Sequence, residues 1–451
     1  MRWIAAVFSC ALMAQASAQT PPRTDHPLLH EVAGAVSEQS LHGYIERMVG
    51  LGTRHTMSDT RSSRRGIGAA RRWVQREFEA MSQACGGCLE IATPSETVSG
   101  TERIPTPTEV VDVLAIQRGT SDPTRVIIIS GHLDSRVSDV MNFRSDAPGA
   151  NDDASGVAAV MEAARVLSQH RFAATLVYAA LSGEEQGLHG GKILADYARA
   201  QGWQVEAVLN NDIIGNTEGL SGVRDNTHVR IFSEGTRAVE TPEQANRRRY
   251  NGGEVDSPSR NLARFMDRLA DEYLTNLDVV MVYRTDRFGR GGDQVRMLEA
   301  GYPSVRVTEA AENYNRQHQD PRRENGIRYG DTIDGVDFPY LAQVTRLNIV
   351  SMAALASAPR PPGGVAIAGN VSPNTTVSWR AVEGAAAYRV WWRSTTDPQW
   401  RTSRLAPGDA TQLVLNGVVI DDWFFGVSSI SADGYESPVV FPGAPGAFFA
   451  E

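Results

Sequence analysis

The sequence predicts an α/β fold, with a doubly wound, mostly parallel sheet flanked by helices, followed by a small C-terminal all-β sandwich. Apolar runs of strand length alternate with helix-like periodic segments between residues 110 and 357, as in βαβ units. Acidic or His-containing clusters follow several of these runs, at the edge where open α/β sheets bind ligands. The Pro/Gly-rich stretch APRPPGG (residues 358–364) then separates this region from a set of short strands, which indicates a domain boundary.

Length and charge restrict the class of protein. A chain of 451 residues is too long for one ordinary hydrophobic core, so two or three domains are expected. The formal net charge of −9 argues against a nucleic-acid partner, because phosphate binding requires a basic surface. No run after the first twenty residues is long and apolar enough to span a membrane.

The N-terminus is typical of a secretory signal peptide. Arg2 supplies a positive charge, residues 3–14 form an apolar stretch, and the small residues Ala16-Ser17-Ala18 suit a cleavage site. We therefore assign residues 1–18 to a signal peptide and expect an exported protein, periplasmic or extracellular.

The cysteines fit export. Cys10 lies within the signal peptide, and a lipoprotein anchor there is less favoured because Phe8 is bulky for such a site. Cys85 and Cys88 remain, in a Cys-Gly-Gly-Cys motif. In a cytosolic protein this spacing could be a redox pair, but in an exported one it is more often a local disulfide. We predict a structural disulfide.

The main domain is expected to open with helices and to continue with alternating strands and helices. Helices are predicted at residues 26–50, 67–82, 154–169, 188–200, 258–273, 293–300 and 335–357. Strands are predicted at residues 110–117, 125–130, 174–181, 205–210, 228–232, 278–283 and 304–308. The run at residues 174–181 is apolar throughout, as in a strand that is buried on both faces. His55 is expected to be a polar loop or packing residue. Residues 234–257 are expected to form a polar loop.

Domain boundaries follow from the linker. The main domain is placed at residues 19–357, the linker at 358–364 and the C-terminal module at 365–451. Strands in the module are predicted at residues 365–368, 375–380, 387–393, 412–415 and 423–429. Trp379, Tyr388 and the DGYES turn (residues 433–437) resemble a fibronectin type III module. Its role is open, and it could contact a surface or a polymer.

Two polar residues follow the strand predicted at residues 125–130. His132 and Asp134 are two apart, so at a strand end their side chains point to the same side. A metal-bound His usually needs an acceptor for its other ring nitrogen, which Asp134 could supply. Asp152 and Asp153 open the next helix, where acidic residues are also common as caps. We read His132 and Asp152 as metal ligands, with a polar strand end and a helix cap as the structural alternatives.

Further candidate ligands follow later strands. Glu184 and Glu185 are adjacent and point in different directions, so one can bind a metal while the other moves a proton. A solvated loop is the alternative. Asp212 ends another buried strand, and His318 lies in a long polar segment where a His is usually just exposed. Together with His132 and Asp152 these residues form a nitrogen and oxygen donor set typical of zinc.

Four ordered motifs resemble one family. GHLDS (residues 131–135), GANDDASG (149–156), SGEEQGLHG (182–190) and NNDIIGN (210–216) resemble the motifs of secreted two-zinc aminopeptidases of the bacterial leucyl type. The wider family includes glutamate carboxypeptidases and glutaminyl cyclases, and the resemblance implies a zinc exopeptidase fold. Single motifs of this length are weak evidence, but four in order are specific.

The resemblance also implies roles for individual residues. Two zinc ions would be bridged by Asp152, with His132 and Asp212 completing one site and Glu185 and His318 the other. Glu184 would be the general base and Asp134 would support His132. A metal-bridging hydroxide would attack the carbonyl of a peptide substrate, and N-terminal residues would be released. A carboxypeptidase, a glutaminyl cyclase or a non-catalytic peptide-binding relative are the alternatives.

Two segments depart from the family pattern. The last His of the family commonly follows a Tyr directly, whereas here Gln317 precedes His318 and Tyr314 lies four residues back. Tyr314 is therefore an uncertain candidate for stabilising the transition state. Relatives often carry Ser-Asp-His where this chain has Gly292-Asp293-Gln294, so substrate contacts are expected to differ there.

Overall fold

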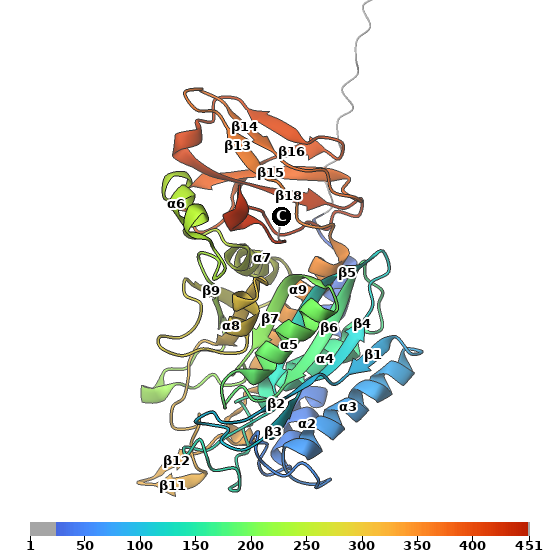
Figure 1. Ribbon diagram of the computed structural model, residues 1–451, viewed down its shortest axis with the longest axis vertical. Helices are drawn as coiled ribbons and strands as arrows, with labels where there is room; N and C mark the ends of the chain where they lie inside the picture. Colours follow the sequence, from blue (N-terminus) through green and yellow to red (C-terminus); the bar gives the residue numbers. More distant parts are fainter. Residues whose placement is uncertain (1–23, 450–451) are drawn as a thin grey trace, which may run out of the picture.

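The computed structural model describes residues 24–449, so the expected signal peptide, including Cys10, lies outside the described residues. An eight-stranded mixed sheet with helices on both faces forms the larger part, and a smaller β module packs at one end of it (Figure 1). The predicted α/β class is confirmed. Between residues 24 and 449, no helix is both long and apolar enough to cross a membrane.

The sheet is mixed, with four parallel and three antiparallel strand pairings, which agrees with the expected mostly parallel sheet. The strand order is β1-β4-β6-β5-β7-β10-β8-β9, and the four strands from β6 to β10 are parallel. The strands are β1 (Leu89–Ala92), β4 (Val113–Gln117), β5 (Asp122–His132), β6 (Ala174–Leu181), β7 (Gln204–Asn211), β8 (His228–Phe232), β9 (Asp278–Val282) and β10 (Ser304–Glu309).

The central strands are buried on both faces, as the continuous apolar runs predict. Along β5, Ile127 and Ile129 face one hydrophobic core, while Val126 and Ile128 face another. The first core also receives α4 (Ala154–Leu167), α7 (Pro258–Tyr273) and α9 (Phe338–Ser357). The second core receives α5 (His189–Ala200) and α8 (Gln294–Glu299). This two-sided burial fixes the carboxyl ends of β5, β6 and β7 side by side.

The N-terminal helical region differs from the prediction. Residues 26–50 form two helices, α1 (Pro27–Gly34) and α2 (Glu38–Val49), because Ser37 is extended and its hydroxyl accepts the N–H of Ser40 at the start of α2. Helix α3 (Ile67–Ala84) follows, and a disulfide joins Cys85 to Cys88 directly after it.

Other differences lie where burial is low or a polar residue interrupts a strand. Residues 110–117 are divided between β3 (Thr108–Val111) and β4, since Asp112 turns inwards and accepts the backbone N–H of Ser182. The expected loop at 234–257 contains a helix, α6 (Pro242–Asn251), which has no buried residue and therefore no apolar period. Four short strands were not predicted either: β1, β2 (Ser95–Val98), β11 (Arg322–Glu324) and β12 (Ile327–Tyr329).

The C-terminal module consists of two three-stranded antiparallel sheets that enclose a core with Trp379 and Tyr388. One sheet contains β13 (Ala366–Ala368), β14 (Thr375–Ser378) and β17 (Gln412–Leu415). The other contains β15 (Ala387–Ser394), β16 (Thr402–Pro407) and β18 (Trp423–Ile430), of which β16 was not predicted. The all-β expectation is confirmed, and the resemblance to fibronectin type III stays a prediction.

A buried ion-pair network docks this module on α7. Arg393 of β15 donates to both oxygens of Asp256, at 2.7 and 2.9 Å, and Arg264 of α7 reaches the same carboxylate at 2.8 Å. All three side chains are almost fully buried. Removing one partner of such a network leaves an uncompensated buried charge, so the module is held firmly against the α/β domain.

Candidate metal centre

The candidate ligands meet at the carboxyl ends of the central strands. His132 is the last residue of β5, Asp212 directly follows β7, and Glu185 lies in the loop after β6. Asp152 lies two residues before α4, and His318 comes from the segment between β10 and β11. Parallel strands end at one edge of a sheet, which is why motifs far apart in the sequence converge here.

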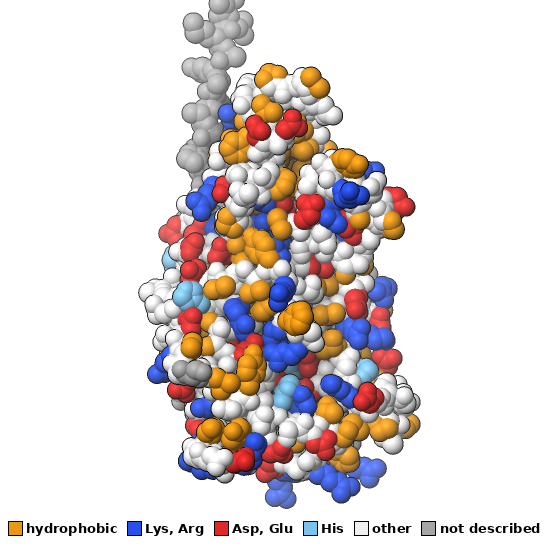
Figure 2. All heavy atoms as spheres, turned by 90° about the vertical axis from the view of Figure 1, so that its left-hand side faces the viewer, with side chains coloured by type: hydrophobic (Ala, Val, Ile, Leu, Met, Phe, Trp, Pro, Cys, Tyr) orange, Lys and Arg blue, Asp and Glu red, His pale blue; other side chains and the backbone are white. Residues whose placement is uncertain are grey.

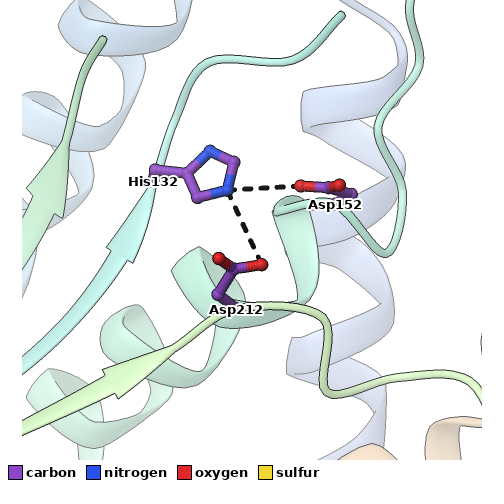
Figure 3. Close-up of side chains that lie close together, drawn as sticks. All are labelled: His132, Asp152 and Asp212. Carbon is purple, nitrogen blue, oxygen red and sulfur yellow. Dashed lines mark ion pairs between the residues drawn. The ribbon is translucent and has the colours of Figure 1, made fainter. Parts of the chain in front are cut away.

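Two groups of side chains could each hold a metal ion, and Asp152 belongs to both. In the first group, Nε2 of His132 lies 3.2 Å from Oδ1 of Asp152 and 3.9 Å from Oδ1 of Asp212 (Figure 3). In the second, Nε2 of His318 lies 2.9 Å from Oδ2 of Asp152 and 3.0 Å from Oε1 of Glu185. Because Asp152 turns one oxygen to each group, its carboxylate is placed to bridge two cations.

The electrostatics of both groups fit a bound cation. Nε2 of His132 and Oε1 of Glu185 are buried, and although they lie 3.2 Å from Asp152 and 3.0 Å from His318, neither contact is aligned as a hydrogen bond, as expected of atoms that can turn to a metal. Burial disfavours a charged imidazole, yet the carboxylates of Glu185 and Asp152 raise the pKa of His318 to about 10. This excess of buried negative charge favours positive ions, and the His and carboxylate donors suit zinc.

His318 is held in an unusual backbone conformation. Its φ of 54° lies in the left-handed region, which is uncommon for residues other than glycine. Its side chain is 28% exposed, more than that of any other candidate ligand. The structure thus brings His318 to the other candidates even though Gln317, and not a Tyr, precedes it. Tyr314 itself is 54% exposed.

Asp152 and Asp153 are fixed by backbone hydrogen bonds. The carboxylate of Asp331, which was not predicted as part of the site, accepts the N–H of Asp152 at 2.7 Å. Asp153 caps α4 by accepting the N–H of Gly156, and it also accepts the N–H of His132 at 2.9 Å. The cap therefore ties the start of α4 to the end of β5.

Asp134 has a different role from the expected one. Its backbone carbonyl, at 3.0 Å, is the acceptor for Nδ1 of His132, while its carboxylate is 3.8 Å from that nitrogen. The carboxylate instead accepts the backbone N–H groups of Gly183, Glu184 and Glu185 at 2.8, 3.3 and 3.0 Å. The side chain of Asp134 is committed to these bonds, so it positions the two glutamates rather than the histidine.

Glu184 lies beside the two candidate metal groups without belonging to either. Burial raises the pKa of Glu184 well above its ordinary value; His132 opposes this shift, and the carboxylates of Asp212 and Glu185 reinforce it. A carboxyl group with a raised pKa near a metal centre is suited to taking and giving protons.

Arginines that were not predicted surround the ligands. Nε of Arg136 donates to Oε2 of Glu185 at 2.9 Å, and its Nη2 lies 2.6 Å from Nδ1 of His318. Nη1 of the buried Arg306 lies 2.5 Å from Oδ2 of Asp212. A Cβ at Gly292 would lie only 2.7 Å from Nη1 of Arg306, so Gly292 leaves the space that Arg306 occupies. A sequence signal existed for Arg306, because this charge lies between Val305 and Val307 within strand β10.

Another arginine supports the loop between the first two motifs. Arg54 is fully buried and donates to the carbonyls of Leu133, Pro148 and Gly149 at 2.7, 2.5 and 2.9 Å. These carbonyls flank the loop that delivers Asp152.

Replacing Arg54 by Met is expected to lower the free energy of unfolding by about 3 kcal/mol, because three buried carbonyls lose their donor. Urea denaturation measures the effect. The exposed Arg61, replaced by Met, serves as control and should change stability by less than about 0.5 kcal/mol. If Arg54→Met changed the free energy of unfolding as little as the control does, Arg54 would be dispensable for this loop.

Known proteins resemble the chain in sequence and in fold. Peptidase family M28 matches residues 112–332. A probable zinc metalloprotease from Leptosphaeria maculans is 42% identical over 90% of this chain and 95% of its own length.

Two solved structures share the fold at lower sequence identity. The LapA aminopeptidase of Legionella pneumophila has a TM-score of 0.53 at 17% identity, covering 78% of this chain and 79% of LapA. A glutaminyl cyclase of Fimbriiglobus ruber has a TM-score of 0.50 at 16% identity, covering 74% of this chain and 97% of the cyclase. The family match spans all the candidate metal ligands, and the identity to a zinc metalloprotease extends over nearly the whole chain. The chain therefore belongs to peptidase family M28 and is a relative of its zinc metalloproteases.

Proposed function

We propose that the chain is an exported exopeptidase that holds two zinc ions and releases N-terminal residues from peptides. One observation carries the proposal: Asp152 presents one oxygen to each of two groups that pair a histidine with a carboxylate. His132 and Asp212 would hold one zinc ion, and Glu185 and His318 the other. The aminopeptidase fold of the LapA structure supports the same assignment.

In the proposed peptide hydrolysis, the zinc ions and the residues of this chain would have separate roles. When bound, two zinc ions would polarise the scissile carbonyl and make water at the site more acidic. Glu184 takes the proton of the attacking water and delivers it to the leaving amine, which its raised pKa allows. Asp134 keeps Glu184 and Glu185 in their separate orientations through the backbone bonds described above.

The proposal is tested on the purified full-length chain with an aminoacyl-anilide and with peptides blocked at either end. We expect hydrolysis from a free N-terminus, loss of activity with a chelator, recovery with zinc, and two zinc ions per chain by elemental analysis. Cleavage of an N-blocked peptide from its C-terminus would identify a carboxypeptidase instead. One zinc ion per chain with cyclisation of N-terminal Gln would identify a glutaminyl cyclase, and turnover that survives exhaustive chelation would exclude a metallopeptidase.

Export is proposed from the N-terminal sequence and is consistent with the disulfide between Cys85 and Cys88, since such bonds persist in oxidising compartments. N-terminal sequencing of the secreted protein should begin at Gln19. A mature protein that starts at Met1 would contradict the assignment.

A further inference from the structure

The segment between β9 and α8 carries three arginines beside the candidate metal centre: Arg284, Arg287 and Arg290. It lies on the left-hand side of the molecule in Figure 1, which Figure 2 shows face-on. Lys and Arg side chains gather in the middle of that face, next to a His side chain (Figure 2). This concentration of positive charge stands out on a chain with a net charge of −9.

Arg287 is the one that reaches the metal-binding groups. Its side chain is 10% exposed, and its Nη2 lies 3.9 Å from Oδ2 of Asp212. Its Nε contacts Asp286 at 3.2 Å, but Nη1 is buried and has no hydrogen-bond partner among the described residues. Nη2 makes no hydrogen bond in this part of the chain either. A buried guanidinium with two nitrogens that make only long ion pairs, at 3.5 and 3.9 Å, is better satisfied when a further acceptor joins it.

The carboxylates around Arg287 already form ion pairs with other arginines. Glu312 receives Arg230 at 2.7 Å and Arg290 at 2.6 Å, and it is only a distant partner of Arg287, at 3.5 Å. Asp212 is paired with Arg306 and, in the proposed function, is a zinc ligand. Four arginines therefore share Asp212, Asp286 and Glu312, and the two longest of these ion pairs, at 3.5 and 3.9 Å, are both made by Arg287, so its guanidinium has capacity left for a further anion.

We propose that Arg287 binds a carboxylate of the substrate, held next to the scissile bond by Nη2 of the guanidinium, whose present ion pair with Asp212 is long. A charge-assisted hydrogen bond from a guanidinium to a carboxylate is stronger than a bond between neutral groups, and arginine stays charged throughout the working pH range. The position of the scissile bond beside Asp212 rests on the proposed function. The carboxylate can come from the free C-terminus of a dipeptide or from an acidic side chain in a longer peptide, and both have the same chemistry.

Binding tests the inference apart from turnover. Zinc-loaded protein with Glu184→Gln is titrated calorimetrically with Ala-Ala, Ala-Ala-amide and Ala-Glu-amide. We expect Ala-Ala, or Ala-Glu-amide, to bind at least tenfold more tightly than Ala-Ala-amide, and the tighter of the two identifies the source of the carboxylate. Adding Arg287→Met should remove the difference, and Arg287→Lys should restore part of it. Equal affinity for all three ligands before Arg287 is changed overturns the proposal.

The matched control is Arg284→Met, on the same segment, where the guanidinium lies 5.6 Å above the ring of Phe288 and forms no ion pair among the described residues. This control variant should retain the full preference for the ligand that carries the carboxylate.

Kinetics with active protein gives a second measurement. Arg287→Met should lower kcat/KM for the carboxylate substrate towards the value for the amide. An equal loss on every substrate would place Arg287 at the reacting carbonyl and overturn the proposal. Carboxylate binding without any peptide hydrolysis would instead refute the proposed function and leave the inference intact.

Discussion

Replacing Glu184 by Gln is expected to lower kcat by a factor of about 1000 while the protein keeps its fold and its zinc. Gln has the same size as Glu but cannot take up a proton from the attacking water. The substitution leaves both candidate metal groups untouched, and the backbone N–H of residue 184 can still donate to Asp134. Steady-state kinetics on an aminoacyl-anilide, with zinc measured on the same sample, provides the check.

A matched control is Glu90→Gln on the edge strand β1. It removes an exposed carboxylate that forms an ion pair with Arg118. It should leave kcat within a factor of two, since exposed ion pairs contribute little. If Glu184→Gln also lost zinc, Glu184 would be a ligand, and the division of labour between the two glutamates would be wrong.

Strands and helices with a strong apolar pattern could be predicted closely from the sequence. The strand at residues 174–181 and the helix at residues 258–273 have the predicted bounds, because burial imposes a period or a continuous apolar run. The break at Ser37 and the helix α6 could not be predicted in this way. Both depend on capping hydrogen bonds of polar residues, which leave no trace in an apolar pattern.

The antiparallel edges of the sheet have a similar explanation. A strand pattern gives the burial of a segment but not its direction relative to its neighbours. Strand β4 runs antiparallel to β6, and β8 runs antiparallel to β10, although β4 is as fully buried as the central strand β6. Direction is decided by how the connecting segments cross the sheet, which is a long-range property.

Four of the five candidate ligands were accessible from sequence because each lies in a short motif at a strand end or before a helix, whereas His318 lies in a long polar segment outside these motifs. The arginines were not, since Arg136 and Arg287 lie in polar loops where a charged residue is normally solvated. Their contacts join residues far apart in the chain, such as Arg136 with His318. Asp134 shows a further limit: its position was predicted, but only the structure shows that its carboxylate faces the backbone of the Glu184–Glu185 loop.

Replacing Asp152 by Ala is expected to abolish zinc binding at both positions and to reduce activity below detection. Asp152 is the only residue shared by the two described groups, so each loses a charged ligand at once. Its backbone N–H still donates to Asp331, which keeps the loop in place. Zinc at 100 times its dissociation constant should stabilise the unchanged protein by about 3 kcal/mol, and this gain should vanish in the variant.

Asp212→Ala is the informative comparison, because it removes a ligand from the first group only. It should keep one zinc ion per chain, held by Asp152, Glu185 and His318, and part of the zinc-induced stabilisation. Elemental analysis after dialysis and thermal unfolding with and without zinc distinguish the two variants. If Asp152→Ala retained one tightly bound ion, the two groups would be independent and Asp152 would not bridge them. We expect the number of bound zinc ions to fall from two to one with Asp212→Ala and from two to none with Asp152→Ala. This graded loss follows only if a single carboxylate serves both positions.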